Sequence, residues 1–271
     1  MGCDIISADS RQIYRGIPIG TAAPTAEQLA MAPHHFIATL DLDQQYSAAQ
    51  YESDVLSLLP SLWEKSDVQI MCGGSMMYVD AVTNGIDQLP TITTEVRQRV
   101  LDIYEAEGLY GIRQILQLLD PVAYERTDPA NPRRNIHAVE ICLQAGKAAS
   151  ELLTGEKKER DFRILKYYIN MPREQLFGRI NARVEQMMAQ GMLDEARSVY
   201  HLRHLNSLNT VGYKELFAFF DGEMDYDTAV ARIAKNTRVY AKKQLTWLKK
   251  DTQATPITLT EGESKILDEI H

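Results

Sequence analysis

The polar segment Asp9-Ser10-Arg11-Gln12 follows directly on an apolar run, Cys3 to Ala8, that is typical of a short buried strand. In open α/β sheets, ligands bind outside the carboxyl ends of the strands, and a carboxylate there can accept a proton or hold an amine. Asp9 is therefore a candidate catalytic group. The same residues are also typical of a turn capped by aspartate or serine, and spacing alone favours the turn.

A second candidate is Cys72-Gly73-Gly74-Ser75, which ends the apolar run from Val68. Glycines allow the backbone to approach a ligand closely, and the Ser75 hydroxyl can bond to a phosphate or a base. A plain strand-to-helix turn is the alternative, and in isolation it is the stronger one.

Two further segments carry side chains suited to RNA. Pro132 to His137 opens a helix with Arg133 and Arg134, and arginine clamps phosphates or stacks on bases. Cations at a helix start oppose the helix dipole, so they are poor stabilising devices. Asn209 to Lys214 joins an aromatic ring to a cation, and it either stacks on a base or starts a helix with Tyr213 in the core.

The strongest charge feature is a helix expected from about Asp227 to Lys250, which has no acid between positions 230 and 250. A solvated helix face usually mixes charge signs, so an unrelieved positive stripe indicates a bound anion, the phosphates of RNA or of a small substrate. A solvated face remains the alternative. The basic residues are Arg232, Lys235, Arg238, Lys242, Lys243, Lys249 and Lys250.

The composition limits the function classes. With 271 residues, 45% hydrophobic and 24% charged, the chain is a globular protein rather than a fibrous or disordered one. Its three cysteines lie far apart, which excludes a disulfide framework and a thiolate zinc site and fits a reducing compartment. The net charge of −8 argues against a purely electrostatic nucleic-acid binder. We find no membrane span, secretory signal or metal-ligand cluster, and expect a cytoplasmic monomer with no membrane partner.

Strands, turns and helices alternate at the start of the chain, which predicts an α/β layer with parallel strands. From Thr94 to about Gly155 only helical patterns occur. One more strand, from Arg163 to Asn170, precedes helices up to the C-terminus. We therefore expect an α/β core at residues 1–88 and 162–271 and a helical insert at 89–161. The early strands are expected at 3–8, 35–40 and 68–72, with a helix at 48–64.

Seven segments together resemble the tRNA dimethylallyltransferases, also called tRNA isopentenyl-pyrophosphate transferases. They occur in that family's order and with similar spacing, from the first residue to about 250. The segments are DIISADSRQIYRGIPIGTAAPT (4–25), YSAAQY (46–51), GGSMMYVDAV (73–82), NPRRNIHAVEI (131–141), GKAASEL (146–152), LNTVGYKEL (208–216) and NTRVYAKKQLTWLKK (236–250).

The resemblance implies alkyl transfer to tRNA. The N6 amine of the adenosine 3′ of the anticodon, in tRNAs that read codons starting with U, attacks the allylic carbon of dimethylallyl diphosphate, and pyrophosphate leaves. The product is N6-isopentenyladenosine, Mg²⁺ assists, and the adenosine is flipped out of its loop. The resemblance also implies a P-loop NTPase-like parallel sheet, with a helical insert that grips the anticodon stem.

The resemblance assigns roles to the candidate residues. Asp9 becomes the catalytic group that accepts or orients the amine proton. Arg238 and Lys242 face phosphate, of either RNA or the diphosphate. The tRNA-binding residues are Asp9, Ser10, Arg11, Gln12, Ser75, Arg97, Arg133, Arg134, Asn135, Ile136, His137, Asn209, Thr210, Val211, Gly212, Tyr213 and Lys214.

One part of the family pattern is missing: an N-terminal strand, a G-x-T-x-x-G-K-T phosphate loop and a helix. No G-x-x-x-x-G-K-[ST] occurs in the 271 residues. That loop would cradle the diphosphate and place the metal, and without its strand a core edge would be open. We expect the native protein to begin earlier than Met1. The alternative is a truncated, catalytically impaired tRNA-binding remnant.

Two smaller departures are Ala23, where many members have lysine, and His137, where arginine is commoner. A third hypothesis is an enzyme that prenylates free adenine nucleotides, which would not need Arg133, Arg134 or Lys214.

Overall fold

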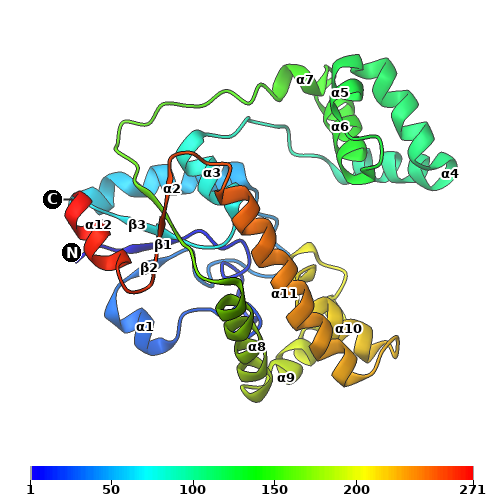
Figure 1. Cartoon of the computed structure of the whole chain (residues 1–271). Coiled ribbons are helices and arrows are strands. Elements are labelled where there is room, and N and C mark those ends of the chain that lie inside the picture. The colour runs from blue at the N-terminus through cyan, green and yellow to red at the C-terminus, as the bar shows by residue number, and fades with distance from the viewer. Residues whose placement is uncertain (1, 271) are drawn as a thin grey trace. The chain divides into compact units, whose positions relative to one another are not determined.

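The computed structural model, which describes residues 2–270, contains a three-stranded parallel sheet (Figure 1). Its strands are β1 (Ile5–Ser7), β2 (His34–His35) and β3 (Ile70–Cys72), in the order β2-β1-β3. Ile5 pairs with both His34 and Ile70. The sequence prediction of parallel strands in an α/β layer is confirmed.

The second strand is shorter than the sequence predicted. Phe36 and Ala38 have φ values of 63° and 50°, in the left-handed region, and a β-strand cannot continue through such residues. The expected strand at 35–40 is therefore wrong beyond His35, and only one isolated bridge, from Tyr14 to Leu40, extends the pairing.

Helix α2 (Ala48–Trp63) covers one face of this sheet. It starts with a capping box, in which Ser47 Oγ accepts from the Gln50 N–H (3.1 Å) and Gln50 Oε1 accepts from the Ser47 N–H (2.8 Å). Its buried face packs on Ile6 of β1, on Ala8 just after that strand and on α3 (Met76–Asn84). Each fully buried aliphatic side chain contributes about 1.5–3 kcal/mol. The buried α2 residues in this core are Tyr51, Val55, Leu59 and Leu62.

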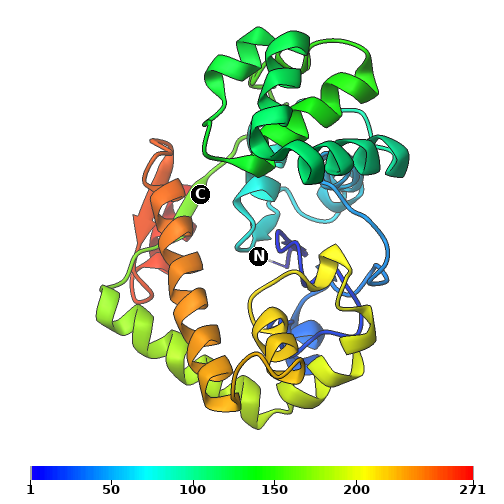
Figure 2. The same ribbon diagram turned by 90° about the vertical axis from the view of Figure 1, so that its right-hand side faces the viewer.

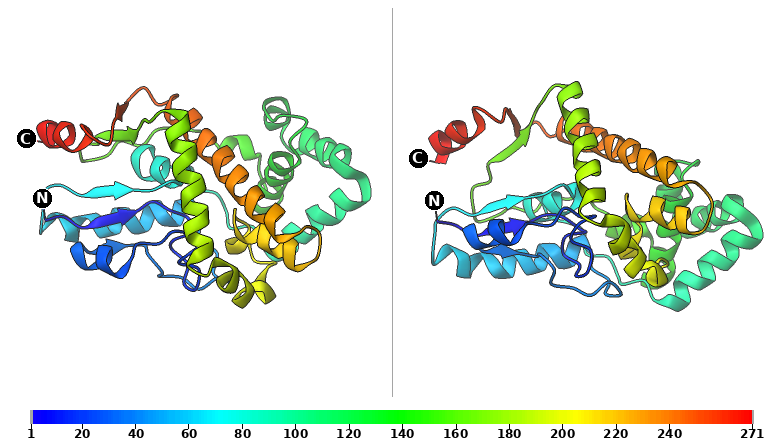
Figure 3. Two further views of the ribbon diagram at one scale, coloured as in Figure 1. Left: turned by 60° about the horizontal axis from the view of Figure 1, so that its bottom comes forward. Right: turned by 90° about the horizontal axis from the view of Figure 1, so that it is seen from below.

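The C-terminal half adds helices and a small second sheet. Helix α11 (Tyr226–Leu248) contacts α8 (Arg173–Ala189), and the two helices are inclined to each other, as Figure 2 and Figure 3 show. The other elements are α1 (Ala26–Met31), α9 (Met192–Ser198), η1 (Tyr200–Leu202), η2 (Asn206–Leu208), α10 (Tyr213–Phe220) and α12 (Gly262–Ile270).

The second sheet joins β4 (Lys166–Ile169) to β5 (Ala254–Ile257) in parallel. The strand expected at 163–170 is confirmed as β4. The expectation of helices alone after residue 170 is wrong at β5, whose four residues carry too little periodicity and include Pro256, a residue that sheets tolerate at edges.

The chain divides into two compact units, one formed by residues up to 83 and from 160 onward, the other by residues 84–159. The sequence placed the insert at 89–161. Residues 84–159 contain helices only, as predicted: α4 (Thr94–Leu119), α5 (Pro121–Arg126), α6 (Pro132–Ala145) and α7 (Ala149–Leu152). The buried Asp120 carboxylate ties α5 to α7 by accepting from the Ala123 N–H (2.9 Å) and from the Ser150 N–H and hydroxyl (2.7 and 2.8 Å).

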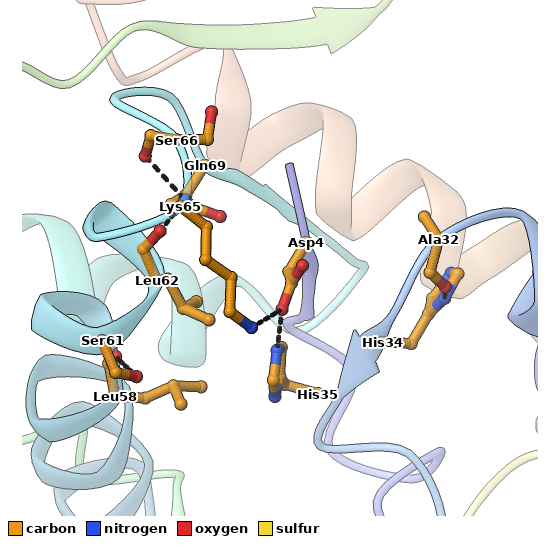
Figure 4. A network of polar contacts seen from close by, with 10 residues as sticks. All are labelled: Asp4, Ala32, His34, His35, Leu58, Ser61, Leu62, Lys65, Ser66 and Gln69. Atoms are coloured by element: carbon orange, nitrogen blue, oxygen red, sulfur yellow. Dashed lines mark hydrogen bonds and ion pairs between the residues drawn. The ribbon is translucent and has the colours of Figure 1, made fainter. Parts of the chain in front are cut away.

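Asp4, at the start of the sheet, links three elements (Figure 4). Its buried carboxylate lies 2.8 Å from His35 Nε2 and 3.7 Å from Lys65 Nζ, just beyond α2. The hydrogen bond with His35 holds the pKa of Asp4 below its usual value, and burial opposes this lowering while the Lys65 charge adds to it. Beside it, Gln69 donates to the Leu62 and Ser66 carbonyls and fixes the turn into β3.

We predict that the stability supplied by Asp4 is lost in acid. Because the folded pKa lies below the unfolded one, the contribution is complete above the unfolded value of about 3.9 and disappears as the pH falls through the folded pKa. Asp4→Asn should lower the free energy of unfolding at about pH 6 and have little effect below about pH 3. Urea unfolding across this pH range measures the difference, and a deficit that persists in acid would contradict the assignment.

Candidate functional site

The segment after β1 forms the turn that carries Asp9. Asp9 Oδ1 accepts hydrogen bonds from the N–H groups of Arg11 (2.8 Å) and Gln12 (3.2 Å). This arrangement is an Asx turn, which orients the carboxylate and leaves Oδ2 outside the turn. The turn that the sequence predicted is confirmed, and Asp9 is partly exposed at the strand end, but its role as a catalytic group stays a prediction.

The turn after β3 is bonded to the turn after β1. The Ser75 N–H donates to the Ala8 carbonyl (3.0 Å), the Ser10 N–H donates to Ser75 Oγ (2.8 Å), and the Ser75 hydroxyl donates to Ser10 Oγ (2.9 Å). At Gly73 a Cβ would overlap the backbone carbonyl group of Ala8. The glycine therefore permits the close approach that brings two of the predicted segments together.

Helix α11 is the third element at this position. The Gly74 carbonyl accepts from the Tyr240 hydroxyl (3.0 Å) and from Gln244 Nε2 (2.7 Å). The sequence analysis named neither residue as part of the site. Their i, i+4 spacing puts them on one face, and that spacing was the available signal.

The side chains of Arg11 and Gln12 hold neighbouring loops. Arg11 Nη1 donates to the carbonyls of Asn206 (2.9 Å) and Ser207 (3.0 Å) in η2. Gln12 Nε2 donates to the carbonyls of Thr21 (3.2 Å) and Ala22 (3.0 Å). Both residues thus fix the surroundings of Asp9, and their contact with tRNA stays a prediction.

The segment Asn209 to Lys214 is a helix start with a core tyrosine. Tyr213 is fully buried, and its hydroxyl donates to the Glu195 carboxylate (2.5 Å), which also accepts from the Ile19 and Gly20 N–H groups (2.8 Å each). The expectation that Tyr213 binds tRNA is therefore wrong for its side chain. Gly212 is buried as well, whereas Asn209 and Lys214 are exposed and Thr210 and Val211 are partly exposed.

Two basic residues of α11, Arg238 and Lys242, contact side chains of α8. Arg238 Nη1 donates to Asn181 Oδ1 of α8 (2.6 Å), and the charged groups of Arg238 and Lys242 lie 5.8 and 5.6 Å from the ring centre of Phe177. The face of the ring attracts these two cations but leaves their positive charges unneutralised. A phosphate contact at Arg238 or Lys242 stays a prediction.

In residues 84–159, the buried carboxylate of Glu140 gathers two predicted RNA-binding side chains. It lies 3.4 Å from Arg97 Nε and 3.2 Å from His137 Nδ1, and both of these side chains are about half exposed. Arg133 and Arg134 are exposed at the start of the same helix, α6.

Two predicted RNA-binding residues of α6 point inward. Asn135 is fully buried, its amide donates to the carbonyls of Asp128 (3.0 Å) and Asn131 (2.8 Å), and its oxygen accepts from Arg113 (3.0 Å). Because the Asn135 side chain is buried and its amide is bonded inside the protein, the prediction that this side chain contacts tRNA is wrong. Ile136 packs against the core of this unit and is only partly exposed.

Among residues 2–270, no group of three or more His, Cys, Asp or Glu side chains is arranged to hold a metal ion. Within the same span, no helix is long and apolar enough to cross a membrane. The buried ion pair between Arg160 and Glu52 (2.6 Å) joins α2 to the chain just after the helical unit.

The fold and site define a class of protein, an α/β protein with a parallel sheet, a carboxylate at a strand end and a cationic helix beside it. The model of the IPP transferase family matches residues 12–251. The chain belongs to this family. Relatives that are more than 50% identical to it are tRNA dimethylallyltransferases, which are prenyltransferase enzymes.

Three relatives illustrate the match. A tRNA dimethylallyltransferase 2 of Parabacteroides distasonis is 54% identical over 254 residues, covering 94% of this chain and 85% of that protein. A tRNA dimethylallyltransferase 1 of Bacteroides fragilis is 53% identical over 249 residues, covering 92% and 83%. The crystal structure of a tRNA isopentenylpyrophosphate transferase from Bacillus halodurans has a TM-score of 0.69 at 30% identity, covering 99% of this chain and 87% of that one.

We predict that Gly73→Ala destabilises the protein. The added methyl group would overlap the Ala8 backbone, which cannot move without breaking the β1–β3 pairing, and overpacking of this kind costs about 1–3 kcal/mol. The free energy of unfolding in urea measures this cost. Gly178→Ala in α8 is the matched control, because the added methyl group meets open space there and removes a helix-interior glycine. A Gly73→Ala protein as stable as the wild type would contradict the close approach.

Proposed function

We propose that the chain transfers a dimethylallyl group from dimethylallyl diphosphate to N6 of the adenosine 3′ of the anticodon, in tRNAs that read codons starting with U. Membership of the IPP transferase family supports the class of reaction and the tRNA substrate. The observation that carries the proposal is the Asp9 turn, which presents an oriented, partly exposed carboxylate at a strand end.

Asp9 provides the group that this reaction needs at the amine. The N6 lone pair forms a bond to the allylic C1, the C1–O bond to the diphosphate breaks, and the nitrogen must lose one proton. In the proposal Asp9 Oδ2 accepts that proton. The two N–H groups on Oδ1 fix the carboxylate before substrate binds, so little orientational freedom is lost in the reaction.

Mg²⁺ is proposed as a cofactor that arrives with the diphosphate. Magnesium is commonly bound by one or two carboxylates together with substrate phosphates, and residues 2–270 supply no cluster that would hold it alone. When bound, the ion neutralises charge on the leaving pyrophosphate. A glycine-rich phosphate loop binds phosphates through backbone N–H groups at a helix N-terminus. We propose that efficient diphosphate binding needs a loop of that type, a motif that does not occur in the 271 residues.

Arginine and histidine side chains of residues 84–159 are proposed to hold the anticodon stem. Arg133 and Arg134 are exposed, and Arg97 and His137 are half exposed and positioned by Glu140. The second candidate function is tRNA binding without transfer, which the same exposed side chains would support.

Replacement of Asp9 should reduce the rate of transfer much more than tRNA affinity. Asp9→Asn keeps an oxygen for the N–H groups of Arg11 and Gln12 but cannot take the proton, so we expect turnover about 10²–10⁴-fold slower. Single-turnover transfer and tRNA binding are measured in the 271-residue chain and in one that carries a family-type strand, phosphate loop and helix at its N-terminus. Asp9→Ala, which also removes the turn, is the comparison. Weaker tRNA binding with undiminished turnover of bound tRNA would refute the role given to Asp9.

Replacement of Arg133 and Arg134 by Ala should weaken tRNA binding and flatten its salt dependence. Each lost phosphate contact reduces the slope of log K against log salt by about 1. Filter binding of an anticodon stem-loop at several salt concentrations measures the slope. Arg126→Ala, an exposed cation at the end of α5, is the control. An unchanged slope in the double variant, or an equal loss in the control, would return the two arginines to a structural role.

A further inference from the structure

Tyr240 presents an exposed aromatic ring next to the Asp9 turn. The residue is 47% exposed, yet its hydroxyl is fixed by the 3.0 Å hydrogen bond to the Gly74 carbonyl. Gln244 donates to the same carbonyl, so α11 is held at this position by two bonds. Gly74 precedes Ser75, whose hydroxyl is bonded to Ser10, the neighbour of Asp9.

The hydroxyl of Tyr240 responds to the charge of Asp9. Burial of the hydroxyl and the negative charge of Asp9 raise the pKa of Tyr240. Burial and Asp9 also contribute to the raised pKa of Tyr78, but that ring is buried and stacked on Tyr51 at 4.3 Å. Tyr14, which also contributes to the raised pKa of Tyr78, is buried as well. Of these three tyrosines, only Tyr240 has a ring that a ligand can reach.

A base that reacts at its exocyclic amine must leave the stack of its loop, and enzymes hold such a base by stacking it on aromatic or apolar side chains. We propose that the Tyr240 ring is the platform on which the target adenine stacks, with its amine directed to Asp9. This inference rests on the proposed function and adds to it the residue that holds the base.

The same face of α11 continues in a way that suits RNA. Lys243 and Trp247 follow Tyr240 by three and seven residues, which places them on its side of the helix, and both are exposed. Aromatic rings that alternate with cations are a general pattern for single-stranded nucleic acid, because the rings stack on bases and the cations meet phosphates. The platform therefore has a cation within one helical turn.

The test uses an anticodon stem-loop with 2-aminopurine in place of the target adenosine, titrated with the 271-residue chain. Stacking on an aromatic ring quenches 2-aminopurine fluorescence. We expect a quenched complex with the wild type and with Tyr240→Phe, which keeps the ring. Tyr240→Leu should give a brighter complex and bind about tenfold more weakly, since one base–aromatic stack is lost. Tyr226→Leu, at the first residue of the same helix, should match the wild type.

The outcomes separate this inference from the proposed function. Equal fluorescence and affinity in the wild type and Tyr240→Leu would overturn the platform and leave the function standing. If Tyr240→Leu raised the KM for dimethylallyl diphosphate and left the RNA fluorescence unchanged, the ring would contact the allyl donor, and the platform would again be overturned. Failure of the wild type to bind the stem-loop would remove both proposals.

Discussion

The approach of the turn after β3 to the turn after β1 is the constraint on which the candidate site depends. Gly73 lies against the Ala8 backbone, and Ser75 is bonded to Ala8 and to Ser10. These contacts set the position of Asp9 relative to Gly74, and Gly74 in turn anchors Tyr240 and Gln244 of α11. A sheet of only three short strands thus places a carboxylate, two serines and a tyrosine together, because backbone groups carry most of the bonds.

Local patterns in the sequence predicted the parts of the fold that local physics decides. Helices α2, α8 and α11 have strong apolar periodicity, and the Asp9 turn has short polar residues that bond their own backbone. Strand β5 was missed because four residues carry almost no periodicity. Strand β2 ends early because Phe36 and Ala38 adopt positive φ, which no sequence pattern announces.

The candidate site was predictable where single segments carry it and not where distant segments meet. Tyr213 and Asn135 have side chains suited to RNA, but both are buried. The Tyr213 hydroxyl donates to Glu195, and the Asn135 oxygen accepts from Arg113. Tyr240 was missed because its partner, Gly74, lies 166 positions away along the chain. Burial and long-range pairing decide which polar side chains face a ligand, and composition and spacing do not contain that information.

The most direct test of the proposed function is transfer of a labelled dimethylallyl group from its diphosphate to unmodified tRNA that reads codons starting with U. The labelled nucleoside is then mapped. The transfer is run with the 271-residue chain and with the same chain carrying a family-type phosphate loop. We expect label on N6 of the adenosine 3′ of the anticodon when the loop is supplied. No label with either protein, while the tRNA is bound, would contradict the transferase account and favour a protein that binds tRNA without modifying it.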